Sequence, residues 1–146
     1  MDRYLEFVLN HYMLSLAFAV VTFLLIQDFI ETALRKFKVI SPILAVTKMN
    51  NDETVVIDVR DESDFIKGHI ENAQNVPLGR LDERLSQLNS YKDRPLIVVC
   101  QTGTRTTPAC RTLTKNGFKD VYSLTGGMQS WEENNLPIRI TAKEKS

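Results

Sequence analysis

The chain has 146 residues, enough for one domain of ordinary size and a small appendage. Its 18 lysines and arginines balance 18 aspartates and glutamates, and it contains no basic helix or aromatic stacking platform, so nucleic acid is not expected as a partner. The two cysteines, Cys100 and Cys110, are too few for a disulfide framework and indicate a reducing compartment in which a thiol can act as a nucleophile.

The N-terminal region contains a long uncharged segment, Phe7 to Gln27, with no Asp, Glu, Lys or Arg. As a helix it would be about 31 Å long, close to the hydrocarbon thickness of a bilayer. A buried core helix would carry a polar stripe, which this segment lacks. A cleaved signal peptide would need a positive leader, and the triplet Ala17-Phe18-Ala19 lies inside the apolar run rather than after it. The segment therefore predicts a single transmembrane helix.

Basic residues flank this segment unevenly. Arg3 precedes it, whereas Arg35, Lys36 and Lys38 follow it, which predicts an outside N-terminus and a cytoplasmic C-terminal domain. The stretch "DFIETALRKFKVI", Asp28 to Ile40, has apolar residues at helical spacing. It would either prolong the membrane helix along the headgroup surface or form a linker helix packed on the soluble domain. We expect residues 1–40 to form the anchor and a juxtamembrane amphipathic helix.

Beyond residue 40 the sequence alternates between helix-like and strand-like segments. Helices are expected in "PILAVTKMNND" after the N-cap Ser41, in "DESDFIKGHI", from Arg80 to Leu88, from Thr106 to Lys115, and in "GGMQSWEENNL". Extended segments are expected at Thr54 to Val59, "AQNVPLG", "PLIVVC" and "DVYSL". Apolar strands that alternate with helices predict an α/β fold with a parallel sheet covered by helices on both faces. We expect this domain to span 41–140, followed by a flexible polar tail at 141–146.

The stretch "LIVVCQTGTRT" places Cys100 at the end of an apolar strand, where ligands bind in parallel sheets. Gly103 allows the following loop to curl, and a helix begins at about Thr106, so backbone N–H groups are expected to face the thiol. Arg105 adds a positive charge. These surroundings would favour the thiolate and bind an anion. The alternative is a structural cysteine at the end of a core strand, although a polar loop directly after it is unlike a core boundary.

Three separated stretches resemble, in order and spacing, the landmarks of the rhodanese domain: "VIDVRDESDFIKGHIENAQNVPLGRL", "VVCQTGTRT" and "LTGGMQSW". The resemblance runs from about Ser41 to Ile140. With the apolar segment in front, the whole chain is similar to the membrane-anchored, single-domain rhodaneses of bacteria. The resemblance implies the rhodanese-like three-layer fold and a location in the bacterial inner membrane.

The same resemblance implies roles for individual residues. Cys100 would be the catalytic nucleophile, which carries a sulfane sulfur as a persulfide. The substrate-binding residues would be Gln101, Thr102, Gly103, Thr104, Arg105 and Thr106. Asp58 and Arg60 match the family's Asp-x-Arg and are expected to hold neighbouring loops near the site. His69 and Cys110 are expected to be structural, although Cys110 could resolve a persulfide as a disulfide. Neither a metal nor an organic cofactor is implied.

The loop length argues against a phosphatase and leaves two candidate functions. Cysteine-dependent phosphatases carry Cys-x5-Arg, whereas Arg105 follows Cys100 with one residue fewer between them, and the shorter loop suits a terminal sulfur better than a phosphoryl group. The first function is a sulfurtransferase that takes small sulfur-containing anions or persulfides and passes sulfur to a thiol or cyanide. The second is an interaction module, tethered to the lipid bilayer and bound to an inner-membrane protein. The intact Cys100 favours the enzyme.

Overall fold

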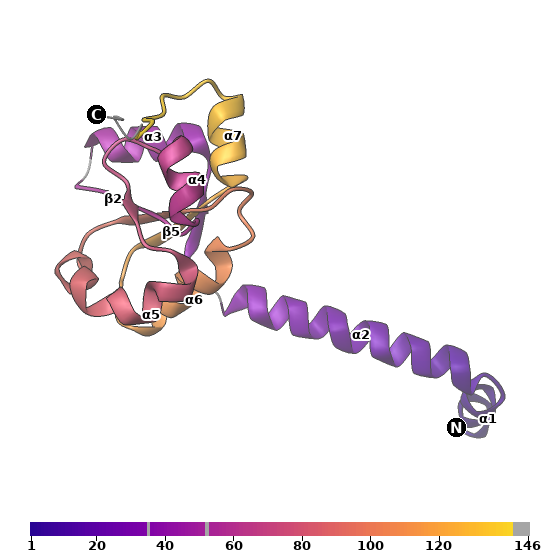
Figure 1. The fold of residues 1–146 in the computed structure, drawn as a ribbon. Coiled ribbons are helices and arrows are strands. Elements are labelled where there is room, and N and C mark those ends of the chain that lie inside the picture. The colour runs from indigo at the N-terminus through magenta and orange to yellow at the C-terminus, as the bar shows by residue number, and fades with distance from the viewer. Residues whose placement is uncertain (35, 52, 142–146) are drawn as a thin grey trace. The chain divides into compact units, whose positions relative to one another are not determined.

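The computed structural model describes residues 1–34, 36–51 and 53–141. The chain divides into two compact units, Met1–Arg35 and Lys36–Ser146 (Figure 1). The flanking residue Arg35 lies outside the described residues, as does the tail expected at 141–146 apart from Thr141.

The first unit consists of two helices, α1 (Asp2–Asn10) and α2 (Tyr12–Ala33). Within α2, Tyr12–Glu31 is long and apolar enough to cross a membrane, and none of it is buried in protein. The apolar span therefore begins at Tyr12 rather than at Phe7. The backbone of His11 leaves the helical conformation, with φ −121° and ψ 41°, and Asn10 and His11 are weak helix formers.

The second unit is built around a parallel sheet of five strands in the order β1-β5-β4-β2-β3. The strands are β1 (Lys38–Ile40), β2 (Val55–Asp58), β3 (Gln74–Asn75), β4 (Leu96–Val99) and β5 (Val121–Leu124). Every residue of the central strands β2 and β4 is buried, which explains why both are apolar apart from Asp58 at the end of β2. Because all pairs are parallel, Asp58, Asn75 and Val99 end their strands at the same edge of the sheet.

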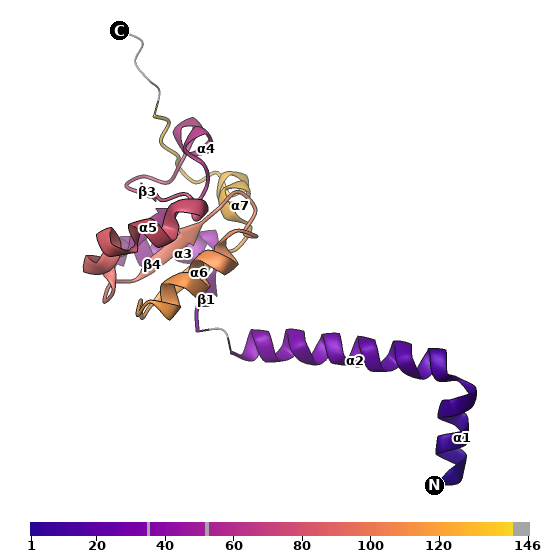
Figure 2. The same ribbon diagram turned by 60° about the horizontal axis from the view of Figure 1, so that its bottom comes forward.

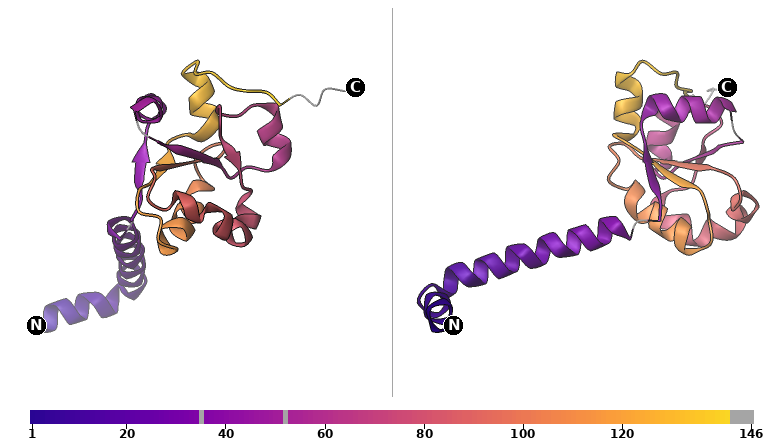
Figure 3. Two further views of the ribbon diagram at one scale, coloured as in Figure 1. Left: turned by 90° about the vertical axis from the view of Figure 1, so that its left-hand side faces the viewer. Right: turned by 180° about the vertical axis from the view of Figure 1, so that it is seen from behind.

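Helices cover both faces of this sheet (Figures 1 and 2). α5 (Leu81–Arg84) and α6 (Thr106–Lys115) pack on one face, and α3 (Pro42–Asn51) and α7 (Gly127–Glu133) on the other. Along β4, Leu96 and Val98 belong to the first core cluster, whereas Ile97 and Val99 belong to the second, as the two-residue period of a strand requires. Figure 3 shows the two helical layers from the side and from behind. The three-layer α/β fold expected from the sequence is confirmed.

Two predicted helices differ from the observed elements. Asp28 to Ile40 is not one helix, because α2 ends at Ala33 and Lys38–Ile40 is an edge strand paired with β5. Apolar spacing alone could not reveal a pairing with a strand so far along the chain. The helix expected from Arg80 to Leu88 is α-helical only over α5 and continues as a 3₁₀ helix, Leu85–Tyr91. Its leucine face still packs on the core.

Candidate active site

Cys100 lies directly after β4, and the loop to Arg105 connects it to the start of α6. The thiol Sγ accepts a hydrogen bond from the Gly103 N–H at 2.8 Å. Gly103 has a φ of +95°, a conformation that glycine adopts at little cost and that turns its N–H back toward the thiol. Only 1% of Cys100 is exposed, so the thiol lies beneath the loop. A thiolate at this position faces a backbone donor and the positive end of a ten-residue helix.

Thr106 fixes the loop from the inside. Its side chain is fully buried, and its hydroxyl donates to the Gly103 carbonyl at 2.6 Å and accepts from the Ser123 hydroxyl at 2.7 Å. Together these two bonds hold Gly103 in place, and the N–H of Gly103 is the group that contacts Cys100. The Thr106 side chain therefore positions the loop, and the substrate contact that the resemblance implies for Thr106 stays a prediction.

The other loop side chains are not buried. Gln101, Thr102, Thr104 and Arg105 are exposed, and the hydroxyls of Thr102 and Thr104 lie 3.4 Å apart. Within the described part of the chain, the Arg105 guanidinium has neither a hydrogen-bond nor an ion-pair partner. It is available to an anion that approaches the loop.

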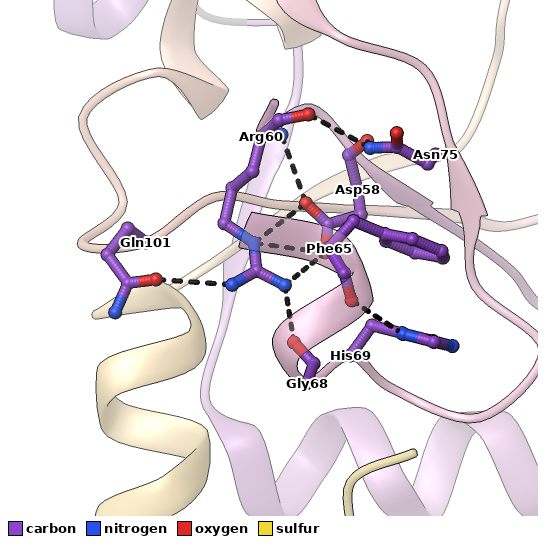
Figure 4. Close-up of polar contacts among 7 residues, drawn as sticks. All are labelled: Asp58, Arg60, Phe65, Gly68, His69, Asn75 and Gln101. Atoms are coloured by element: carbon purple, nitrogen blue, oxygen red, sulfur yellow. Dashed lines mark hydrogen bonds and ion pairs between the residues drawn. The ribbon is translucent and has the colours of Figure 1, made fainter. Parts of the chain in front are cut away.

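Asp58 and Arg60 form a buried ion pair at the end of β2, with Asp58 Oδ2 2.7 Å from Arg60 Nη2 (Figure 4). Arg60 Nη2 also donates to the Gly68 carbonyl at 2.7 Å, and Arg60 Nη1 donates to Gln101 Oε1 at 3.2 Å. The guanidinium thus ties the end of α4 (Glu62–Lys67) to the first residue after Cys100. The sequence indicated that this pair holds loops, but not that one of them is the cysteine loop.

The glycine pair before α7 approaches the cysteine loop from the other side. Met128 N–H donates to the Cys100 carbonyl at 2.8 Å, and Gln129 N–H donates to the Gln101 carbonyl at 3.0 Å. Gly127 has a φ of +58°, and a Cβ placed on it would lie 2.2 Å from the Cys100 oxygen. Only glycine permits this approach, so the N-terminus of α7 holds the backbone at Cys100.

Two further residues that the sequence singled out lie away from this chemistry. His69 Nδ1 donates to the Phe65 carbonyl at 2.8 Å and its ring stacks on Phe65, so the imidazole is satisfied locally (Figure 4). Cys110 is buried within α6 in the same core cluster as Cys100. Burial, together with the nearby charge of a Cys100 thiolate, raises the pKa of the Cys110 thiol to about 12. The Cys110 thiol therefore stays protonated at neutral pH.

Comparison with known proteins places this geometry in a family. Residues 42–134 match the family model of the rhodanese-like domain. The uncharacterised Escherichia coli protein YibN is 32% identical over 139 residues, which cover 94% of this chain and 97% of YibN. The Shewanella oneidensis thiosulfate sulfurtransferase GlpE is 41% identical over 80 residues, 55% of this chain and 77% of GlpE.

A solved structure agrees with these sequences. A rhodanese-related protein from Thermoplasma volcanium superposes with a TM-score of 0.65 at 29% identity, covering 71% of this chain and 99% of the other. The family model spans Cys100 and its loop, and the YibN match covers almost the whole chain. The chain belongs to the rhodanese-like domain family.

Proposed function

We propose that this protein is a membrane-anchored sulfurtransferase. It moves a sulfane sulfur from thiosulfate or a persulfide, through a persulfide on Cys100, to a thiol or cyanide acceptor. The observation that carries the proposal is the bond from the Gly103 N–H to Cys100 Sγ at the head of α6. Family membership supports sulfurtransferase chemistry, and one relative is named for it.

The first step is an exchange of sulfur–sulfur bonds. The Cys100 thiolate attacks the outer sulfur of thiosulfate, a new S–S bond forms, and the bond inside thiosulfate breaks so that sulfite leaves with the electron pair. The Gly103 N–H and the N-terminus of α6 stabilise the sulfur anion that they face. Arg105 is placed to attract the anionic donor, because it is the cation within the loop itself and is exposed.

The second step returns the enzyme to its starting state. A cyanide or thiolate acceptor attacks the outer sulfur of the Cys100 persulfide. The S–S bond to Cys100 breaks, the cysteine leaves as a thiolate, and the product is thiocyanate or a new persulfide. The two steps form a covalent cycle that consumes neither an oxidant nor a reductant.

We further propose that α2 anchors the enzyme in the bacterial inner membrane with its N-terminus outside. Support comes from the apolar stretch Tyr12–Glu31 and from Lys36 and Lys38, which follow it, against Arg3 alone before it. The rhodanese unit would then lie in the cytoplasm, where Cys100 remains reduced.

Turnover tests the enzyme directly. The purified full-length protein is incubated with thiosulfate and cyanide, and thiocyanate is measured. Cys100→Ser should abolish the reaction because a serine hydroxyl is not ionised at neutral pH, and Cys110→Ser should keep most of it. If the wild-type protein forms no thiocyanate and accepts sulfur from no persulfide donor, the interaction module becomes the better account.

A further inference from the structure

A pocket lies on the rhodanese unit, outside the cysteine loop. It has a volume of about 350 Å³ and lies between α4, the 3₁₀ turn Leu78–Arg80 and α5. Its lining combines three apolar residues with charged and polar ones: Phe65, Ile66 and Pro77, and Glu62, Asn75, Arg80, Arg84 and Thr141. A pocket with an apolar wall and a few polar groups is the usual form of a small-molecule site.

The charges in this pocket are of both signs, and two of the three charged side chains have no partner among the described residues. Among the described residues, neither Glu62 nor Arg80 has a hydrogen-bond or ion-pair partner through its side chain, although both line the pocket. Arg84 Nη1 makes one long contact, 3.4 Å, to the Asn75 carbonyl. Two guanidiniums and one carboxylate that face one cavity without pairing match a ligand that carries a carboxylate and an ammonium together.

The pocket is joined to the cysteine loop by hydrogen bonds. Asn75 Nδ2, which lines the pocket, donates to the Arg60 carbonyl at 2.9 Å, and the Arg60 guanidinium donates to Gln101 (Figure 4). Asn75 ends β3, and β2 separates β3 from β4, the strand that leads to Cys100. Two strand spacings are about 10 Å, so the carboxyl ends of β3 and β4 lie within the length of a tripeptide of each other.

The geometry points to a binding site for the amino-acid head of a small thiol or persulfide, with the carboxylate on Arg80 and Arg84 and the ammonium on Glu62. The sulfur of the same molecule then reaches Cys100 as donor or acceptor. The inference of a head-group site depends only on the pocket, whereas its role in substrate choice rests on the sulfurtransferase proposed above.

The head-group site is tested by equilibrium binding that needs no reaction at Cys100. S-methylglutathione has a γ-glutamyl head with both charges and a blocked sulfur, and its binding to the full-length Cys100→Ser protein is measured by calorimetry. Arg80→Gln and Glu62→Gln should each weaken binding about tenfold, the loss expected for one charged hydrogen bond. Acetylation of the ligand's ammonium should have the same effect as Glu62→Gln.

Arg94→Gln is the matched control, because Arg94 precedes β4 at the opposite edge of the sheet and donates to the Glu53 carbonyl. The affinity of S-methylglutathione for the Arg94→Gln variant should equal its affinity for the protein with an unmodified pocket. Arg80 is exposed, so Arg80→Gln is expected to fold, and a melting curve verifies it. If S-methylglutathione does not bind, or binds equally to Arg80→Gln and Arg94→Gln, the inference is wrong.

The role in sulfur transfer is tested by comparing two acceptors. In the otherwise wild-type protein, Arg80→Gln with Arg84→Gln should lower the rate constant for transfer to glutathione about tenfold. Transfer to 2-mercaptoethanol, which has no charged head, should not change. Equal losses for both acceptors, or no loss for glutathione, would overturn this role. Failure of the wild-type protein to form a Cys100 persulfide would instead refute the proposed sulfurtransferase activity. The binding experiment would still show whether the pocket binds the amino-acid head.

Discussion

Cys100 and Cys110 share one buried cluster but have different chemical surroundings. The Cys100 Sγ accepts a backbone N–H and lies at the N-terminus of a helix, so a negative charge there is stabilised by fixed dipoles. Cys110 lies inside that helix, where burial holds the pKa of its thiol at about 12. These surroundings support the proposed catalytic role of Cys100 and a structural role for Cys110.

The raised pKa of Cys110 predicts a specific loss of stability in alkali. The ordinary pKa of a cysteine thiol is 9.0, so the folded state holds this proton more tightly than the unfolded state does. The contribution of the Cys110 proton to the free energy of unfolding is therefore fully present below pH 9.0 and is lost as the pH rises toward about 12. Denaturant unfolding of wild type and Cys110→Ala, both under reducing conditions, should show a steeper alkaline decline in the free energy of unfolding for wild type. Parallel declines would mean that Cys110 does not titrate as argued.

Arg105 is expected to act on the donor rather than on the fold. It is exposed, and the described residues offer it no partner, so Arg105→Ala should leave the melting temperature nearly unchanged. The loss of one charge-assisted contact, about 1.5–3 kcal/mol, should lower kcat/KM for thiosulfate by roughly one to two powers of ten. Steady-state kinetics with Arg94→Ala as a control measures this. An unchanged kcat/KM would show that Arg105 does not bind the donor.

At the scale of elements, the cysteine loop is held between two segments that are distant in sequence. Arg60, after β2, binds Gln101 from one side, and the N-terminus of α7 binds the Cys100 and Gln101 carbonyls from the other. The loop is therefore fixed before any substrate arrives, as electrostatic stabilisation of a sulfur anion requires.

Gly127→Ala should break this arrangement. The new Cβ would lie 2.2 Å from the Cys100 oxygen, at a φ of +58° that side-chain-bearing residues avoid. We expect a loss of more than about 2 kcal/mol in the free energy of unfolding and a loss of sulfurtransferase activity. Gly79→Ala is the matched control, since a Cβ there meets nothing within 4 Å. Equal stability and activity of the two variants in denaturant and turnover assays would show that the close approach is unimportant.

The elements that local patterns could predict are those whose sequence reflects their own burial. The apolar runs of β2 and β4 and the helix that starts at Thr106 were predicted from the sequence, because a buried strand or a capped helix is a local property. β1 was missed, because Lys38–Ile40 becomes a strand only by pairing with β5.

The same limit applies to the site. Cys100, Gly103 and Arg105 are close in sequence, so their grouping could be predicted from the sequence. The bonds from Arg60 to Gln101 and from Ser123 to Thr106 join residues far apart in the chain, and no local signal indicated them. The Gly126-Gly127 pair at the start of α7 is a distant feature with a sequence signal, since paired glycines suggest a close backbone approach.

At the scale of the whole molecule, a rhodanese unit follows a helix with the length and composition of a membrane span. The 32% identity with YibN covers 94% of this chain, so the two proteins share more than the rhodanese unit. Attachment would confine sulfur transfer to the membrane surface.

A charge in the middle of the apolar helix tests this attachment. Val20→Arg should cost about 2.5–3.5 kcal/mol of insertion and shift the protein toward the soluble fraction after carbonate extraction. Lys38→Arg, outside the helix, should not change the distribution. If Val20→Arg remains as firmly membrane-associated as wild type, Tyr12–Glu31 is not the sole anchor.

Cys100 is proposed to carry the transferred sulfur, and intact mass spectrometry of the full-length protein can detect that sulfur. After incubation with thiosulfate and removal of the excess, the mass should rise by about 32 Da, the addition of one sulfur. Peptide mapping should place this sulfur on Cys100, and cyanide should remove it. Cys110→Ser should gain the same mass, and Cys100→Ser should gain none. A wild-type mass that does not change with thiosulfate or any persulfide donor, or a sulfur that maps to Cys110, would contradict the account.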